Sequence, residues 1–175
     1  MSDFESIQLT DEQQDFVNTA LSGRNILVNA CIGSGKTTAI QKLCNLIPQD
    51  KSILYLTYNR LLKLDAKKKI TAKNATVTNY HGFAYKILRE NGVCVGQGDQ
   101  ISVFLDLKLP IPHYDVLILD EYQDINKDIS EELLYIKAKC PEIQIIAVGD
   151  MDQKIYDFTT LDVSAFIHTF LDDGN

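Results

Sequence analysis

Residues 30–38, ACIGSGKTT, bring glycines, a lysine and hydroxyl side chains between a short apolar run and a stretch with helical spacing. Glycines let backbone N–H groups turn inward around a phosphate, and a helix N-terminus adds partial positive charge. A lysine can neutralise phosphate oxygens, and a hydroxyl can ligate magnesium. The segment therefore predicts a loop that binds a nucleoside triphosphate. The residues expected to form it are Ala30, Gly33, Ser34, Gly35, Lys36, Thr37 and Thr38.

Within this loop, we expect Lys36 to neutralise the β and γ phosphates of ATP and Thr37 to ligate Mg²⁺. The pattern normally begins with glycine, whereas this loop begins with Ala30. That position lies where the preceding strand ends, before the tight part of the loop, so alanine is a minor departure. The alternative is a glycine-lysine turn without a ligand, and the order strand, loop, helix favours the phosphate loop.

Two acids, Asp120 and Glu121, follow a second apolar run at residues 116–119. Asp120 can hold magnesium, and Glu121 can orient or deprotonate the attacking water. An acidic pair after a strand is often only a turn or a helix cap, but downstream of a phosphate loop the catalytic interpretation is favoured. We expect Lys36, Thr37, Asp120 and Glu121 to converge, from two neighbouring strand ends, on one magnesium-bound triphosphate.

The elements that would position these residues alternate along the chain. Near-continuous apolar runs suit strands covered on both faces, and they lie at residues 26–30, 53–57, 75–78, 116–119 and 145–148. Helical patterns with capping or stop signals separate them, at residues 10–23, 34–47, 59–69, 80–91 and 128–139. This alternation predicts an α/β fold, with helices on both faces of a parallel sheet.

The composition fits one ordinary globular domain, with 175 residues of which 45% are hydrophobic. No apolar run is long enough to cross a membrane and no signal peptide is recognisable, so an intracellular, soluble protein of undetermined compartment is expected. The four cysteines stand singly, which argues against zinc and disulfides and for packing roles. Residues 93–113 are the least regular segment, interpreted as a short insertion.

The net charge of −7 means that any surface for nucleic acid must be local, because phosphates are bound chiefly by lysine and arginine. One stretch concentrates basic residues, and a solvated helix face is as good an explanation for it as a phosphate contact. Its members are Arg60, Lys63, Lys67, Lys68, Lys69 and Lys73.

Residues 120–124, DEYQD, and 149–158, GDMDQKIYDF, resemble motifs II and III of the UvrD/Rep group of superfamily 1 helicases. Other segments resemble further motifs of that family, in the family's order. They are residues 9–13 for the Q motif, 56–60 for motif Ia and 78–83 for motif Ib. The resemblance runs from Leu9 to Phe158, nearly the whole chain.

This resemblance implies roles for individual side chains. Gln13 would read the adenine edge, for which an amide is chemically suited, although Thr10 and Gln13 also form a capping-box pattern. Gln153 would sense the γ-phosphate as a third catalytic residue beside Lys36 and Glu121. The single strand would be contacted by Tyr58, Asn59, Thr78, His81, Tyr156 and Phe158, the last two by stacking on bases.

The resemblance also implies a P-loop NTPase of RecA-like fold, the first motor domain of an ATP-dependent, Mg²⁺-dependent DNA helicase of 3′ to 5′ polarity. Single-stranded DNA is the expected partner, and the residues do not distinguish it from RNA. The family's larger inserted subdomain is reduced here to residues 93–113. The second motor domain, with its arginine fingers, is absent from this sequence, so the chain alone should bind ATP but hydrolyse it slowly.

Two other functions remain open at this point. The chain could be a stand-alone binding module that ATP switches without translocation. A small-molecule kinase is a weaker possibility, because residues 153–156 have no evident purpose in one.

Overall fold

The computed structural model describes residues 6–29, 35–58, 60–96 and 98–150, and within these ranges five strands form one parallel sheet. The order across the sheet is β1-β5-β4-β2-β3. All the strands run in one direction, so their carboxyl ends share one edge, as expected for this class of fold. The strands are β1 (Ile26–Asn29), β2 (Ile53–Thr57), β3 (Ala75–Asn79), β4 (Val116–Asp120) and β5 (Gln144–Gly149).

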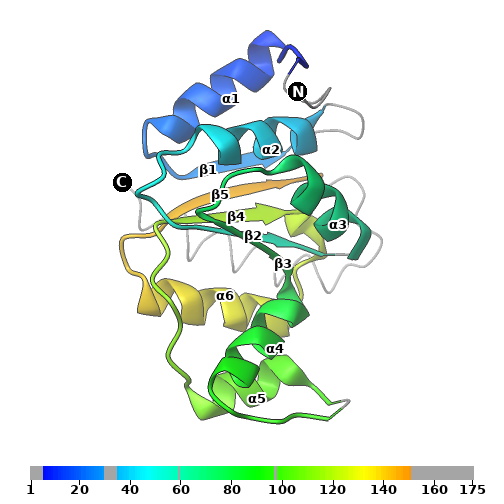
Figure 1. Ribbon diagram of the computed structural model, residues 1–175, viewed down its shortest axis with the longest axis vertical. Coiled ribbons are helices and arrows are strands. Elements are labelled where there is room, and N and C mark those ends of the chain that lie inside the picture. The colour runs from blue at the N-terminus through cyan, green and yellow to red at the C-terminus, as the bar shows by residue number, and fades with distance from the viewer. Residues whose placement is uncertain (1–5, 30–34, 59, 97, 151–175) are drawn as a thin grey trace.

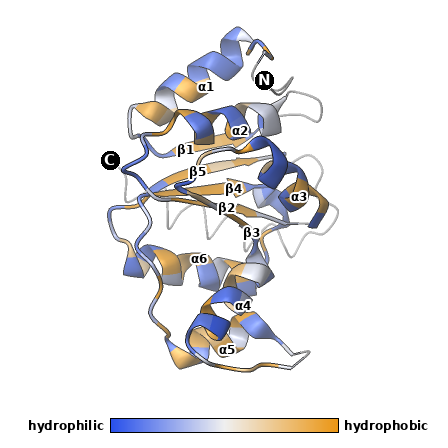
Figure 2. Ribbon diagram, in the orientation of Figure 1, coloured by the Kyte–Doolittle hydropathy of each residue, from blue (hydrophilic) through white to orange (hydrophobic). Residues whose placement is uncertain are grey.

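Helices cover both faces of the sheet, which confirms the predicted fold class (Figure 1). On one face lie α1 (Asp11–Leu21), α2 (Lys36–Leu46) and α3 (Arg60–Lys69). On the other lie α4 (Tyr80–Glu90), α5 (Gln100–Leu107) and α6 (Lys127–Lys139). The central strands are coloured as hydrophobic in Figure 2, and every residue of β2 and β4 is buried.

Each face has its own hydrophobic cluster because alternate strand residues point to opposite sides. In β2, Leu54 and Leu56 join the cluster under α4, α5 and α6, whereas Ile53 and Tyr55 join the cluster under α1, α2 and α3. Each continuous apolar run therefore contributes side chains to the hydrophobic clusters on both faces, and this holds the sheet between two layers of helices.

Several helix starts follow the expected capping chemistry. The Thr10 side chain accepts from Gln13 N, and the Gln13 side chain accepts from Thr10 N, so the capping box at α1 is present. Asn79 caps α4 by accepting from Gly82 N at 2.8 Å. A side chain on Gly82 would collide with this cap and with Thr78, so glycine is required there.

Residues 93–113 are more ordered than their sequence suggested. They contain α5, whose Phe104 packs edge-on against Phe83 of α4 and Tyr135 of α6, with ring centroids 6.0 and 5.0 Å apart. The segment is therefore part of the core of the domain. A short 3-10 helix, η1 (Tyr122–Asp124), was also not anticipated.

Two further expectations need correction. The strands β1 and β4 are not neighbours, because β5 lies between them, so the predicted site spans three strand ends. Cys94 is exposed and does not pack, whereas Cys44 and Cys140 are buried as predicted. Among the residues that the structure describes, no cluster of metal-ligating side chains occurs, and none of their helices is long and apolar enough to cross a membrane.

Candidate nucleotide-binding site

The phosphate-loop segment enters α2 through Gly35, in the left-handed conformation with φ 71°. Glycine is needed here on two counts, because L side chains disfavour this conformation and because an added Cβ would collide with the Gln13 amide. Gln13 Nε2 donates to the Gly35 carbonyl at 3.0 Å. The start of α1 is thereby tied to the end of the loop.

Lys36, the first residue of α2, reaches the acidic end of β4. Its Nζ lies 3.6 Å from Glu121 Oε1, and the two side chains are only 11% and 19% exposed. The same Nζ is buried and makes no hydrogen bond within the described structure. A buried ammonium that makes an ion pair but no hydrogen bond is incompletely satisfied, so this group is suited to receive an anionic ligand.

Asp120 ends β4 and is fully buried. The Tyr55 hydroxyl donates to its Oδ2 at 2.8 Å, and the Glu121 backbone N–H donates to its Oδ1 at 3.0 Å. Burial raises the pKa of Asp120 to about 6, and the hydrogen bond from Tyr55 and the charge of Lys36 oppose this rise. The carboxyl is thus fixed in place by two donors and is readily ionised near neutral pH.

Glu121 occupies the left-handed region with φ 59°, one of two described non-glycine residues with positive φ. Such strain persists where the surroundings enforce it, and it concentrates at functional sites. The Gln123 side chain lies beside Glu121, since its Nε2 donates to Glu121 Oε2 while its Oε1 accepts from Asp150 N at 3.0 Å. The buried amide therefore links the ends of β4 and β5.

Close packing at the end of β5 depends on Gly149. A Cβ added there would lie 2.7 Å from Tyr122 Cδ1 and would also overlap the Gln123 amide. The three strand ends are in register, since Gly149 pairs with Asn29 of β1 and Asp120 pairs with Val148 of β5. The site is consequently built across three adjacent strands.

A small hollow opens beside Lys36, between the two helices nearest β1. It is lined by Glu12, Gln13, Phe16, Val28, Lys36, Ala39 and Val148. Gln13 thus lies near the loop, as the adenine assignment requires, but its amide is already engaged with Thr10 and Gly35. The capping-box interpretation is confirmed, and the adenine contact stays a prediction.

Three of the residues predicted to contact a single strand are described, and they lie at β2, β3 and the start of α4. Tyr58 follows β2 and is 47% exposed, Thr78 lies in the adjacent β3 and is buried, and His81 is exposed in the first turn of α4. The strands β2 and β3 are neighbours. These side chains therefore lie at the two strands on one side of β4, whose end carries the Glu121 carboxylate that Lys36 reaches.

Thr37 and Thr38 lie in the first turn of α2 and are partly buried. Thr37 directly follows Lys36, so it opens the same helix end. The other predicted site residues lie outside the described residues: Ala30, Gly33, Ser34, Asn59, Gln153, Tyr156 and Phe158.

Two residues of this site were not anticipated. Tyr55 was hidden within an apolar strand run, and Gln123 was noted only as part of a motif. Tyr55 was detectable in principle, because a tyrosine inside a buried strand needs a partner for its hydroxyl. Nothing local in the sequence marks the partner of Gln123, which lies 27 residues away.

Comparison with known proteins agrees with this geometry. The chain matches the AAA domain family over residues 13–159. It is 36% identical over 61 residues to one subunit of the ATP-dependent helicase/nuclease of Lactiplantibacillus plantarum, a match that covers 35% of this chain and 5% of that protein.

Solved helicases resemble the chain in fold. The Pif1 helicase from Candida albicans superposes with a TM-score of 0.58 at 18% identity, covering 84% of this chain and 33% of that one. The Bacteroides Pif1 helicase in complex with ADP-AlF3 and ssDNA gives 0.56 at 19%, covering 91% and 37%. The chain thus spans about a third of each solved helicase. The chain belongs to the AAA domain family, and it shares the fold of about a third of each of these two Pif1 helicases.

Proposed function

We propose that the chain is the ATP-binding motor domain of a DNA helicase and that ATP binds at the end of β1. The observation that carries this proposal is the buried Lys36 ammonium, which faces the Glu121 carboxylate and makes no hydrogen bond with any residue that the structure describes. A cation held in this way at the N-terminus of a helix fits a polyphosphate. The family match and the similarity in fold to two solved Pif1 helicases support the same assignment.

The residues present also fit a magnesium ion. Thr37 and Asp120 would hold it, and the ion would neutralise charge on the phosphates. The Tyr55 hydroxyl keeps one carboxylate oxygen of Asp120 in place. Lys36 would bind the β and γ phosphates, and Glu121, oriented by Gln123, would position or deprotonate the attacking water. Gln153 would sense the γ-phosphate, and Gln13 would contact the adenine.

The single strand would cross the carboxyl ends of β2 and β3, contacting Tyr58, Asn59, Thr78 and His81, and would continue to Tyr156 and Phe158. DNA is the proposed nucleic acid because ssDNA is bound by the Bacteroides helicase of similar fold. A second RecA-like domain would complete the ATP site with arginine side chains. The 3′ to 5′ polarity stays a prediction.

The experiment that tests this proposal measures binding of a labelled single-stranded oligonucleotide with and without a non-hydrolysable ATP analogue. A motor domain couples its two ligands, so we expect the affinities to differ between the two states. No oligonucleotide binding in either state would contradict the helicase assignment. Equal binding in both states would contradict the coupling, and with it both the motor and the alternative of an ATP-switched module.

A helicase motor domain and an ATP-switched binding module are distinguished by fusing a second motor domain to this chain and measuring ATP hydrolysis. Translocation requires that the added domain stimulate ATP hydrolysis in the presence of a single strand. An ATP-switched binding module would keep its slow hydrolysis, because no arginine side chain is needed to release its partner.

A further inference from the structure

The outer edge of the sheet carries a groove that the nucleotide site does not use. It runs along β3, the last strand of the sheet, between α3 and α4, and encloses about 530 Å³. Its floor is polar at Thr76 and Thr78. The groove is defined by Lys63, Lys67, Ile70, Ala75, Thr76, Val77, Thr78, Gly82 and Lys86. We call it the β3 groove.

Three ammonium groups line the β3 groove from two sides. On α3, Lys63 and Lys67 are four residues apart, so one helix face presents both of them. Lys86 comes from α4 on the opposite wall. No acidic side chain lines the groove among the described residues. In a chain with a net charge of −7, a local cluster of three positive side chains favours binding of an anionic partner.

Among the described residues, the charges that act on Lys63 are also positive. The pKa of Lys63 is lowered by partial burial and by the positive charges of Lys67 and Arg60. Lys86 Nζ lies 3.9 Å from Glu90 Oε1, and both side chains are at least 40% exposed. Exposed ion pairs of this kind contribute little. The groove therefore keeps a positive field that an extended polyanion would relieve.

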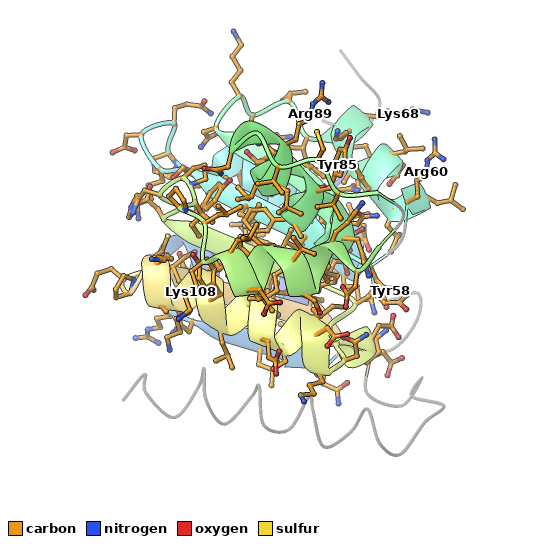
Figure 3. All side chains as sticks on the ribbon, turned by 90° about the horizontal axis from the view of Figure 1, so that it is seen from below. Tyr58, Arg60, Lys68, Tyr85, Arg89 and Lys108 are labelled. Atoms are coloured by element: carbon orange, nitrogen blue, oxygen red, sulfur yellow. The ribbon has the colours of Figure 1, made fainter. Side chains whose placement is uncertain are left out.

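An aromatic side chain lies next to the groove. Tyr85 is 46% exposed, and it lines a second, adjoining hollow together with Lys86, Arg89 and Glu90. Figure 3 shows Arg60, Lys68 and Arg89 projecting outward on the side of the molecule formed by α3 and α4. Basic grooves with exposed aromatic rings suit unpaired bases, because each base offers a face for stacking.

We propose that the β3 groove binds the sugar-phosphate backbone of a single nucleic-acid strand, with Tyr85 stacking on an unpaired base. This inference rests on the proposed function, and it adds a contact surface beyond the residues of the helicase motifs. Thr78 connects the two surfaces, since it belongs to both the predicted strand path and the groove floor. The strand would leave the carboxyl edge of the sheet and follow its outer edge.

The test compares two triple variants of the whole 175-residue chain, using a labelled oligothymidylate and fluorescence anisotropy at several salt concentrations. One variant is Lys63→Gln, Lys67→Gln and Lys86→Gln. The control, Lys51→Gln, Lys108→Gln and Lys127→Gln, removes the same charge outside the groove. Each phosphate contact to a single strand contributes about 0.7 to the salt slope, so the groove variant should lose about 2 from its slope and at least tenfold in affinity.

Replacing the three groove lysines with arginine should preserve binding. Tyr85→Ala should weaken it several-fold, whereas Tyr85→Phe should not. If the wild-type chain binds and the groove variant matches the control, the groove inference is wrong while the proposed function stands. If the wild-type chain binds no single strand, both fail. An equal loss of affinity for a blunt duplex would overturn the single-strand assignment.

Discussion

The carboxyl edge of the sheet and the β3 groove both contain several charged side chains, but these differ in burial and in sign between the two regions. At the carboxyl edge, Lys36, Asp120 and Glu121 are largely buried and of mixed sign, and side-chain donors hold the two carboxylates. In the groove, Lys63 and Lys67 are of one sign and accessible to solvent. Buried mixed charges favour one ligand in one geometry, whereas an exposed field of one sign favours any polyanion and is screened by salt.

Asp120→Asn tests the cost of burying charge at the carboxyl edge. Burial raises the pKa of Asp120 to about 6 from its ordinary value of 3.8, so the folded state binds the proton more tightly than the unfolded state. The free energy of unfolding should therefore fall as pH rises through this window, by about 3 kcal/mol in total. Because the variant lacks this charge, we expect it to be more stable than the wild type at pH 7, as measured by urea unfolding.

The matched control is Asp115→Asn, whose effect should have the opposite sign. The pKa of Asp115 is lowered, chiefly by the hydrogen bond from the Ser52 backbone. Its carboxylate therefore stabilises the fold above its unfolded pKa, and this contribution is lost as pH falls through the folded pKa. An Asp120→Asn variant that is less stable than the wild type at neutral pH would contradict the account of the buried edge.

Gly149→Ala tests the packing of the three strand ends. Its new methyl group would overlap Gln123 and Tyr122, and overpacking of this kind costs about 1–3 kcal/mol. Gly96→Ala is the control, because an added Cβ there meets nothing within 4 Å. Urea unfolding of both variants should show a loss only at Gly149, and equal stability of the two would refute the close packing.

Tyr55→Phe removes a donor from the buried carboxylate without changing its neighbours. We expect a loss of roughly 1–2 kcal/mol at pH 7, as is typical when a buried charged group loses a hydrogen bond. Because this bond lowers the pKa of Asp120, the variant should require a higher pH for magnesium-dependent nucleotide binding. Tyr85→Phe, at an exposed ring, should change neither quantity. Identical pH profiles for Tyr55→Phe and the wild type would argue against a positioning role.

Lys67→Gln tests the β3 groove, and of these variants it should have the smallest effect on the free energy of unfolding. Relief of its repulsion with Lys63 should leave the free energy of unfolding within about 0.5 kcal/mol of wild type, or slightly above it. Chemical denaturation at low and high salt measures this. A loss well above about 1 kcal/mol would mean that the groove lysines support the fold itself.

Local patterns predicted much of the fold. Five apolar runs became the five strands, and the Thr10 capping box starts α1 as expected. The prediction failed where residues depend on distant partners. Helix α5 spans only eight residues and is held by packing of its buried Ile101 and Phe104 against α4 and α6, so the local pattern is too short to predict it.

The candidate site divides in the same way. Lys36 and Glu121 were predicted as site residues from short motifs, and the structure brings their side chains within 3.6 Å of each other. The order of the strands was not predicted, because the position of β5 between β1 and β4 is set by the folded sheet and by no local pattern. Tyr55 and Gln123 act through residues 65 and 27 positions away, respectively, which no local pattern records.

Binding of magnesium-bound ATP at the proposed site depends on the buried Lys36 ammonium, which would contact the phosphates. The most direct test is calorimetric titration of ATP with magnesium into the wild-type chain, Lys36→Ala and the exposed control Lys51→Ala. We expect binding by the wild type and the control, and none by Lys36→Ala, with all three chains folded by circular dichroism. Undiminished affinity in a folded Lys36→Ala chain would contradict the assignment of this site.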